Sequence, residues 1–259
     1  RDHCVTGVQT CALPIYGGKN YMGNCSAQTQ RALITGGTRG IGFRIAETLI
    51  RNGVQVCIAG SKKETVDEAA TTLHAAGAIS VDLEQPDAPA KLIAQAVDVL
   101  GGLDLVVNNA GVSLQAALEE TTFSDWDRIM HINARAPYFI CKEALPHLRR
   151  STCPAIVQIA SVVSHDGYAL QSAYAASKHA LVGFTKSLAR EMQADGVRVY
   201  TISPGGVATD MIGSIRPDID TGALIDPQEI ADLVWFLISH RGNAMIDHLD
   251  VRRSNKLPW

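Results

Sequence analysis

The sequence predicts an α/β protein with a doubly wound parallel sheet and helices on both of its faces. Short apolar strands alternate with helical segments from Arg31 onward, which is the pattern of parallel strands joined by crossover helices. Right-handed crossovers place the ligand crevice of such a sheet at the carboxyl ends of its strands. Twenty-two glycines and only 5% aromatic residues fit many tight turns between aliphatic elements.

The first half of the chain alternates strand and helix between glycine signals. An apolar strand enters a glycine-rich loop, and the helix after it places Ile41, Ile45 and Leu49 on one face. Gly53 ends that helix, and Gly77 ends the next one. The expected elements are a strand at 32–34, a helix at 41–50, a strand at 54–59, a helix at 62–76, a strand at 79–81 and a helix at 86–100.

The second half continues the alternation with longer helices. Residues 122–148 form one helical region, in which we expect Pro137 and Pro146 to cause kinks or ends. The remaining expected elements are strands at 103–107, 154–159, 197–202 and 245–251, and helices at 171–194 and 226–240.

Composition excludes several classes of partner. The 259 residues carry 23 basic and 26 acidic side chains, a formal net charge of −3, so we expect neither nucleic acid nor an anionic membrane as a partner. No apolar run approaches the roughly 20 residues that span a bilayer. We expect a cytoplasmic protein in which Cys57, Cys141 and Cys153 are buried thiols.

Residues 1–28 differ from the rest of the chain and show neither a helical nor a strand period. The stretch 5–15, VTGVQTCALPI, resembles a translated sequencing-library adapter. We therefore expect residues 1–28 to be a disordered or artefactual leader, with an ordinary flexible leader as the alternative. Residues 29–259 then form one dinucleotide-binding catalytic domain.

A glycine loop follows the first strand and opens the first helix. Its glycines are Gly36, Gly40 and Gly42. Glycine permits positive φ and close approach of the backbone to a ligand, and a helix N-terminus offers free amides to a phosphate. A plain structural turn is the alternative, but the position between strand and helix favours dinucleotide binding.

The end of the second strand indicates which dinucleotide is bound. NAD sites place a carboxylate there, whereas NADP sites place a cation nearby. The chain has Gly60 and Ser61 at this point, followed by Lys62, and Arg39 in the glycine loop. These residues favour NADP over NAD.

Three residues form a candidate proton-transfer set. Ser161 follows the fifth strand, and Tyr174 and Lys178 are four residues apart on a helix, so the last two share a face. A neighbouring ammonium lowers the pKa of a phenol, which fits the tyrosine for proton exchange with an alcohol. An exposed helix pair is the alternative, but it leaves the serine and the dinucleotide loop unexplained.

Together these motifs resemble the short-chain dehydrogenase/reductase family, whose fold is the Rossmann type, over residues 29–240. Residues 35–42, 108–111 and 204–205 carry the resemblance, together with Asn133, Ser161, Tyr174 and Lys178. It implies that Tyr174 is the acid/base, that Ser161 polarises the substrate oxygen, that Lys178 also binds the nicotinamide ribose, and that Asn133 holds a relay water.

The resemblance also implies a cofactor-binding set. Asp82 would contact the adenine, and Val207 and Thr209 would hold the nicotinamide carboxamide. The full set is Gly36, Thr38, Arg39, Gly40, Ile41, Gly42, Ser61, Lys62, Asp82, Leu83, Asn109, Ala110, Gly111, Tyr174, Lys178, Pro204, Gly205, Val207 and Thr209. A homodimer or homotetramer packed through helices 122–148 and 171–194 is implied as well.

The expected function is that of an NADP-dependent oxidoreductase, a carbonyl reductase that interconverts a ketone or aldehyde with its alcohol. The alternatives are a non-catalytic dinucleotide-sensing regulator and, among enzymes, an epimerase or dehydratase. The carboxyl-terminal stretch lacks the Thr-Gly and Asp-Gly-Gly elements common in the family's acyl-carrier-protein reductases, which weakens an assignment to fatty-acid elongation.

The substrate pocket is expected at 112–117, 162–171 and 210–225, with His165, Tyr168 and Gln171 along its wall. The sequence predicts no metal site, because the histidines on or beside helices lack ligand spacing: His131, His147, His179 and His240.

Overall fold

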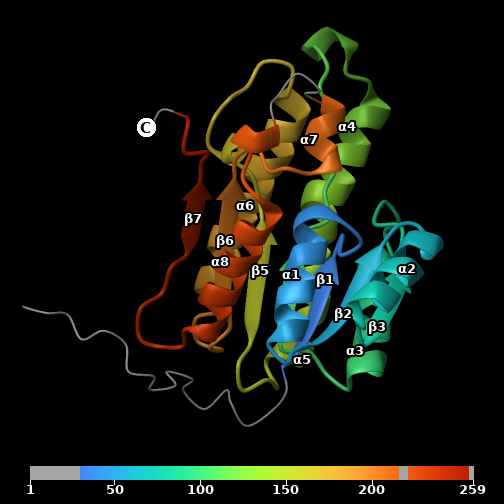
Figure 1. The fold of residues 1–259 in the computed structure, drawn as a ribbon, viewed down its shortest axis with the longest axis vertical. Coiled ribbons are helices and arrows are strands. Elements are labelled where there is room, and N and C mark those ends of the chain that lie inside the picture. Colours follow the sequence, from blue (N-terminus) through green and yellow to red (C-terminus); the bar gives the residue numbers. More distant parts are fainter. Residues whose placement is uncertain (1–29, 216–220, 257–259) are drawn as a thin grey trace, which may run out of the picture.

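The computed structural model describes residues 30–215 and 221–256. Seven parallel strands form one sheet in the order β3-β2-β1-β4-β5-β6-β7 (Figure 1). The strands are β1 (Arg31–Thr35), β2 (Gln55–Gly60), β3 (Gly77–Ser80), β4 (Leu105–Asn108), β5 (Ala155–Ile159), β6 (Arg198–Pro204) and β7 (His248–Val251). The predicted doubly wound sheet is therefore confirmed. The predicted leader, residues 1–28, lies outside the described residues.

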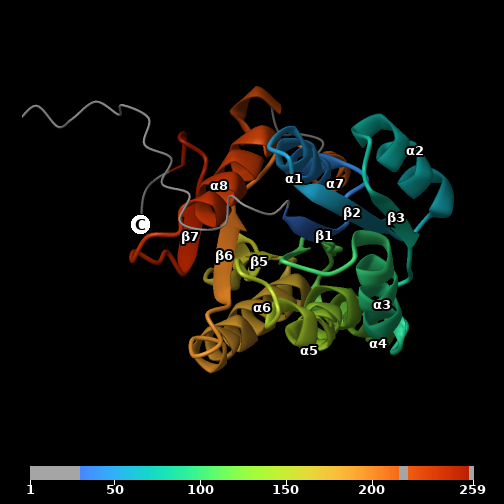
Figure 2. The same ribbon diagram turned by 90° about the horizontal axis from the view of Figure 1, so that it is seen from below.

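Helices cover both faces of this sheet. They are α1 (Gly40–Arg51), α2 (Lys63–Leu73), α3 (Ala88–Leu100), α4 (Phe123–Met130), α5 (Ala136–Leu148), α6 (Ser172–Glu191), α7 (Asp210–Ile215) and α8 (Pro227–Ser239). Seen from below, α1, α2 and α8 lie on one side of the strands, and α3, α4, α5 and α6 on the other (Figure 2). Short turns η2 (Leu118–Glu120), η4 (Val162–Ser164) and η5 (Thr221–Ala223) and a π-helix, η3 (His131–Arg135), complete the described elements.

Strand alternation divides the core into two layers. In β1, Ile34 packs in the cluster under α1 and α8, whereas its neighbour Leu33 packs in the cluster under α3 and α5. Both side chains are fully buried. Because successive side chains on a strand point to opposite faces, every central strand must be apolar on both, which explains the continuous apolar runs of the sequence.

The strand order reverses direction between β1 and β4. β2 and β3 follow β1 on one side of it, whereas β4 pairs with β1 on its other side. In sheets of this kind, ligands bind outside the carboxyl ends of the strands at the reversal point. Thr35 and Asn108 end these two neighbouring strands, which locates the candidate site.

The helical region predicted at 122–148 consists of three consecutive helical segments. Pro137 has no N–H to donate to the carbonyl of Asn133 four residues earlier, so a regular α-helix cannot continue there. The chain passes through the π-helix at this point and continues into α5. Pro146 lies inside α5, which still extends to Leu148.

The cysteines agree only in part with expectation. Cys57 and Cys141 are buried free thiols, and burial raises the pKa of each to about 12. Cys153 was also expected to be a thiol, and that prediction is wrong, because Cys153 is disulfide-bonded. Among the helices of the described residues, none combines the length and the apolar character needed to span a bilayer.

Candidate active site

The three predicted proton-transfer residues come together at the carboxyl end of β5. Ser161 lies just beyond this strand and caps η4, where its hydroxyl accepts a bond from the amide of Val163 at 3.4 Å. Tyr174 and Lys178 lie on α6. The Ser161 side chain lies near the Tyr174 phenol and acts to lower its pKa. The structure thus joins a strand end and a helix into one polar site.

Burial sets the ionisation of this site. It raises the pKa of the Tyr174 phenol, and the hydrogen bond with Ser161 opposes the rise. Burial also lowers the pKa of Lys178 to about 8. The phenol therefore shifts opposite to the direction predicted from the sequence. The physical reason is that burial disfavours the charged phenolate. The ammonium of Lys178 donates to the carbonyl of Ile159 at 3.0 Å and lies 5.9 Å from the tyrosine ring centroid.

Asn133 is fully buried and bound to two neighbouring segments. Its amide nitrogen donates to the carbonyl of Val112 at 2.8 Å and to the hydroxyl of Ser177 at 3.0 Å. Its oxygen accepts from the amide of Val112 at 2.9 Å. Both N–H groups of the side chain are therefore engaged by protein, which leaves a relay water only the oxygen or the backbone of this residue. That water remains a prediction.

Ser177 belongs to the hydrogen-bond network of the site and was not among the predicted residues. Its hydroxyl accepts from Asn133 and donates to the carbonyl of Tyr174 at 2.7 Å. It is fully buried, one residue before Lys178. Ser177 lies in the Tyr-Ala-Ala-Ser-Lys run, so its place beside Tyr174 and Lys178 can be read from the sequence. Its hydrogen bond to Asn133, 44 positions away, cannot.

The glycine loop has the backbone that a phosphate site requires. Gly36 and Gly40 adopt positive φ values of 64° and 54°. A side chain at Gly42 would overlap the carbonyl oxygen of Gly36 and the side-chain nitrogen of Asn109. No side chain caps the first turn of α1, and an uncapped helix N-terminus of this kind fits a pyrophosphate.

Asn109, after β4, fixes this loop. Its side-chain nitrogen donates to the carbonyls of Thr35 and Gly36 at 3.0 and 2.9 Å. The hydroxyl of Thr35 in turn accepts from the amides of Asn109 and Ala110, both at 3.0 Å. The loops after β1 and β4 therefore form one unit. In the sequence Thr35 is only the first residue of the glycine motif, and its bonds to Asn109 and Ala110 depend on the adjacency of β1 and β4.

Gly111 lies between the two halves of the site. A side chain there would come within 3.3 Å of the Asn133 oxygen and 3.6 Å of the Lys178 nitrogen. Both are polar atoms of the predicted catalytic set. Glycine at this position thus keeps open the space beside them.

The predicted 2′-phosphate residues line one pocket of about 420 Å³ between α1 and α2. Thr38, Arg39, Ser61 and Lys62 are all on its wall, together with Glu68. The guanidinium of Arg39 is 3.2 Å from the carboxylate of Asp210, and the two side chains are 76% and 74% exposed. Arg39 is therefore at the predicted pocket but paired across the crevice with the start of α7.

Asp82 and Leu83 follow β3 as predicted. The carboxylate of Asp82 accepts from the amide of Glu84 at 3.0 Å and from the side chain of Gln85 at 2.9 Å. These bonds hold the pKa of Asp82 below its usual value. Leu83 packs against the core under α3. The carboxylate thus shapes the turn into α3, and its contact with adenine remains a prediction.

The loop after β6 closes the crevice on the far side. Gly205 donates its amide to the carbonyl of Val251 at 2.7 Å, directly after Pro204. Val207 is buried and forms a parallel bridge with Ile225. The methyl group of Thr209 lies 3.0 Å from the position of a side chain at Gly40, so this loop and the glycine loop face each other across the crevice.

The comparisons with known proteins agree with this geometry. The family model described as short chain dehydrogenase matches residues 30–220. A 3-oxoacyl-acyl-carrier-protein reductase, FabG, from Vibrio cholerae is 33% identical over 217 residues, which is 80% of this chain and 89% of the relative. A 3alpha-hydroxysteroid dehydrogenase from Mediterraneibacter gnavus is 34% identical over 222 residues, again 80% and 89%.

Solved structures give the same result. A metagenomic short-chain oxidoreductase in complex with NADP superimposes with a TM-score of 0.75 at 30% identity and covers 87% of this chain and 97% of that one. A dehydrogenase/reductase from Sinorhizobium meliloti 1021 gives a TM-score of 0.78 at 34% identity, with 86% and 93% covered.

Proposed function

Because the chain belongs to the short chain dehydrogenase family, we propose that it is an NADP-dependent reductase that interconverts a ketone or aldehyde with its alcohol. The observation that carries the proposal is that Ser161, Tyr174 and the buried Lys178 lie together at the carboxyl end of β5. A protein that only senses a dinucleotide has no evident need for this arrangement.

Burial favours the neutral phenol of Tyr174. In this protonated form Tyr174 donates its proton to the oxygen of a carbonyl under reduction. The Ser161 hydroxyl donates to the same oxygen and stabilises its developing negative charge.

Lys178 stabilises the tyrosinate left behind. With a pKa of about 8 it is mostly protonated at neutral pH, and its positive charge near the ring favours the anion. Asn133 holds the helix that carries Tyr174 and Lys178 through Ser177, and we assign the relay water to this end of the site.

The dinucleotide-binding residues fit NADPH, which supplies the hydride when bound. Gly36, Gly40 and Gly42 let the backbone approach the pyrophosphate, and Asn109 fixes the loop. Arg39, Ser61 and Lys62 line the pocket that we assign to the 2′-phosphate. The structural relative in complex with NADP supports this choice. We expect NADPH to bind with a lower dissociation constant than NADH, and the reverse order overturns the assignment.

The substrate is a small carbonyl compound or alcohol, and its class stays open, because the relatives include an acyl-carrier-protein reductase and a hydroxysteroid dehydrogenase. A panel of ketones, aldehydes and secondary alcohols, followed by NADPH absorbance, identifies it. Because the carboxyl-terminal stretch lacks the Thr-Gly and Asp-Gly-Gly elements, we expect acyl-carrier-protein thioesters to be poorer substrates than small ketones, aldehydes and alcohols.

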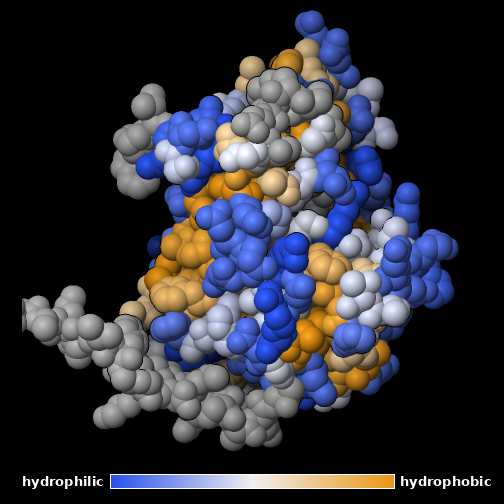
Figure 3. Space-filling model, in the orientation of Figure 1, coloured by the Kyte–Doolittle hydropathy of each residue, from blue (hydrophilic) through white to orange (hydrophobic). Residues whose placement is uncertain are grey.

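We also propose a homodimer or homotetramer that packs through α5 and α6. Tyr138 and Phe139 on α5 are 51% and 39% exposed, and the ring of Tyr138 lies 5.4 Å from that of Phe184 on α6. Apolar surface also lies beside α8 and β7, at the left of the view (Figure 3). Sedimentation velocity gives the assembly, and a monomer at micromolar concentration contradicts it.

The test of the reaction is Tyr174→Phe. We expect loss of turnover by at least about 100-fold, with NADPH affinity changed less than about twofold. The matched control is Tyr200→Phe, because the hydroxyl of Tyr200 is buried without a hydrogen-bond partner among the described residues. Unchanged turnover in Tyr174→Phe refutes the mechanism.

A further inference from the structure

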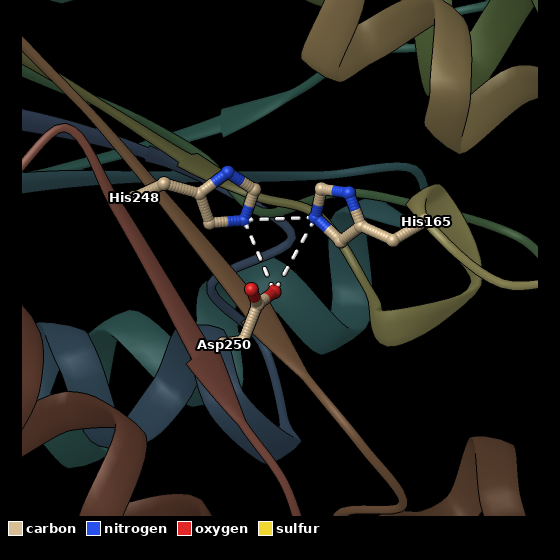
Figure 4. Close-up of side chains that lie close together, drawn as sticks. All are labelled: His165, His248 and Asp250. Carbon is tan, nitrogen blue, oxygen red and sulfur yellow. Dashed lines mark hydrogen bonds and ion pairs between the residues drawn. The ribbon is translucent and has the colours of Figure 1, made fainter. Parts of the chain in front are cut away.

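Two histidines and an aspartate converge outside the predicted catalytic set. His248 and Asp250 are two residues apart on β7, so their side chains share a face of the sheet. His165 follows η4. The three ligand atoms face one another (Figure 4): Nε2 of His165 and Nε2 of His248 are 3.1 Å apart, and each is 3.3 Å from Oδ1 of Asp250.

Protons cannot fill every edge of this triangle. The two Nε2 atoms carry at most one proton each and the carboxylate carries none at neutral pH, so at least one short edge has no hydrogen. The Ser203 hydroxyl, 2.8 Å from Nε2 of His248, is placed to donate to that nitrogen. A cation would take the place of that bond at Nε2 and would bind all three atoms at once.

The geometry points to a binding site for a divalent transition-metal ion of the zinc type. Zinc in proteins takes His nitrogen at about 2.0–2.1 Å and carboxylate oxygen at about 2.0–2.2 Å, usually in a tetrahedron. The edge of such a tetrahedron is about 1.6 times the bond length, or roughly 3.3–3.4 Å. The three distances of 3.1, 3.3 and 3.3 Å match one of its faces, with an ion roughly 0.8 Å above the plane.

The donor chemistry selects the same class of ion. Two imidazoles and one carboxylate suit zinc and its first-row neighbours, whereas magnesium and calcium prefer oxygen donors throughout. The side chain of Asp250 is 54% exposed, so the site opens to solvent on that side.

The metal would join two segments 83 positions apart in the sequence. Ser203 on β6 lies under the cluster, with its hydroxyl 2.8 Å from Nε2 of His248 and 3.3 Å from the hydroxyl of Ser164. Ser164 donates to the carbonyl of Ser161 at 2.6 Å. A metal bound by His165 and His248 would therefore connect the end of η4 to β7, next to the backbone of Ser161, the candidate catalytic serine.

The experiment is zinc titration of the untagged full chain, followed by calorimetry after dialysis against a chelator. We expect one zinc ion per chain, and affinity at least about 100-fold lower in both His248→Gln and Asp250→Asn. A control variant, His74→Asn, removes an exposed histidine beside the opposite edge strand and keeps wild-type affinity. Cobalt in place of zinc gives the visible absorption of a tetrahedral site in the wild type and in His74→Asn, and not in His248→Gln or Asp250→Asn.

Thermal unfolding provides a second measurement. Zinc at about 100 times its dissociation constant raises the Tm of the wild type by roughly 5–10 °C and does not raise that of Asp250→Asn. Should His248→Gln fail to fold, the exposed Asp250 variant decides the question. Absence of zinc binding, or equal binding in the wild type and Asp250→Asn, overturns the proposal. The proposal is independent of the reductase activity, because no step of the measurement uses turnover.

Discussion

The side-chain nitrogen of Asn133 donates to the hydroxyl of Ser177 at 3.0 Å, although 44 residues separate them. Asn133 lies in the π-helix and Ser177 in α6. This bond fixes the helix that carries Tyr174 and Lys178 against the neighbouring helical layer. The orientation of the proton-transfer residues therefore depends on a bond between two buried side chains behind them.

Ser177→Ala tests this dependence. The substitution leaves one N–H of the buried Asn133 amide without its partner, and we expect kcat to fall about 10-fold with NADPH affinity little changed. Stability falls by about 1–2 kcal/mol. Thr185→Val is the control, because it also removes a buried hydroxyl from α6, one that donates to Leu181. Equal kcat in the two variants contradicts a positioning role.

Arg39→Ala and Asp210→Asn test the assignment of the phosphate pocket. We expect the first to weaken NADPH binding about 10-fold and leave NADH binding unchanged, because a guanidinium recognises the 2′-phosphate by charge-assisted hydrogen bonds. The second frees Arg39 from its carboxylate, so NADPH binding tightens about twofold, which is the scale of an exposed ion pair. Dissociation constants from protein fluorescence measure both, and parallel changes for NADPH and NADH refute the assignment.

Lys178→Met tests how much the buried ammonium lowers the free energy of unfolding. The lysine pKa is lowered from 10.5 to about 8 in the folded chain, so the unfolded chain binds more protons between these values. Wild-type stability must therefore rise with pH in that window. We expect the difference in unfolding free energy, wild type minus variant, to rise by about 2 kcal/mol from about pH 7 to about pH 10. The subtraction removes the contributions of Cys57 and Cys141. A flat difference shows that burial does not control this amine.

Gly42→Ala tests the close approach at the glycine loop. Alanine favours an ordinary helix position by up to about 1 kcal/mol, but here its methyl group overlaps backbone atoms that cannot move independently. We expect a loss of at least about 2 kcal/mol in stability and of NADPH binding. Gly183→Ala on α6 meets no atom within 4 Å and should stabilise the protein. Denaturant unfolding compares the two, and equal effects refute the argument.

Much of the fold follows from local pattern. The strands were identified because parallel strands buried on both faces must be apolar throughout, and the helices because their apolar residues repeat with a helical period. The π-helix was not predicted, because Pro137 in a helical pattern usually indicates a kink or an end, and only packing against the rest of the fold shows which local solution is adopted.

The sequence predicts those parts of the site whose residues lie close together in the chain. Tyr174 and Lys178 share a helix face by their separation alone. The partner of Asn133 and the anchoring of Asn109 by Thr35 depend on strand order. His165 was expected on the substrate wall, which stays a prediction, and the structure also brings it to His248 and Asp250. That contact joins residues 83 and 85 positions apart, beyond the reach of any local pattern.

The pairing of Arg39 with Asp210 has a consequence for the two ends of the crevice. Asp210 begins α7, beside the segment expected to surround the substrate, and it loses its partner whenever Arg39 turns to a phosphate. Coupling free energies are reciprocal. If the release of α7 changes substrate affinity, occupation of the substrate side must change cofactor affinity by the same factor. Discrimination between the two dinucleotides would then be a property of the ternary complex as well as of the pocket.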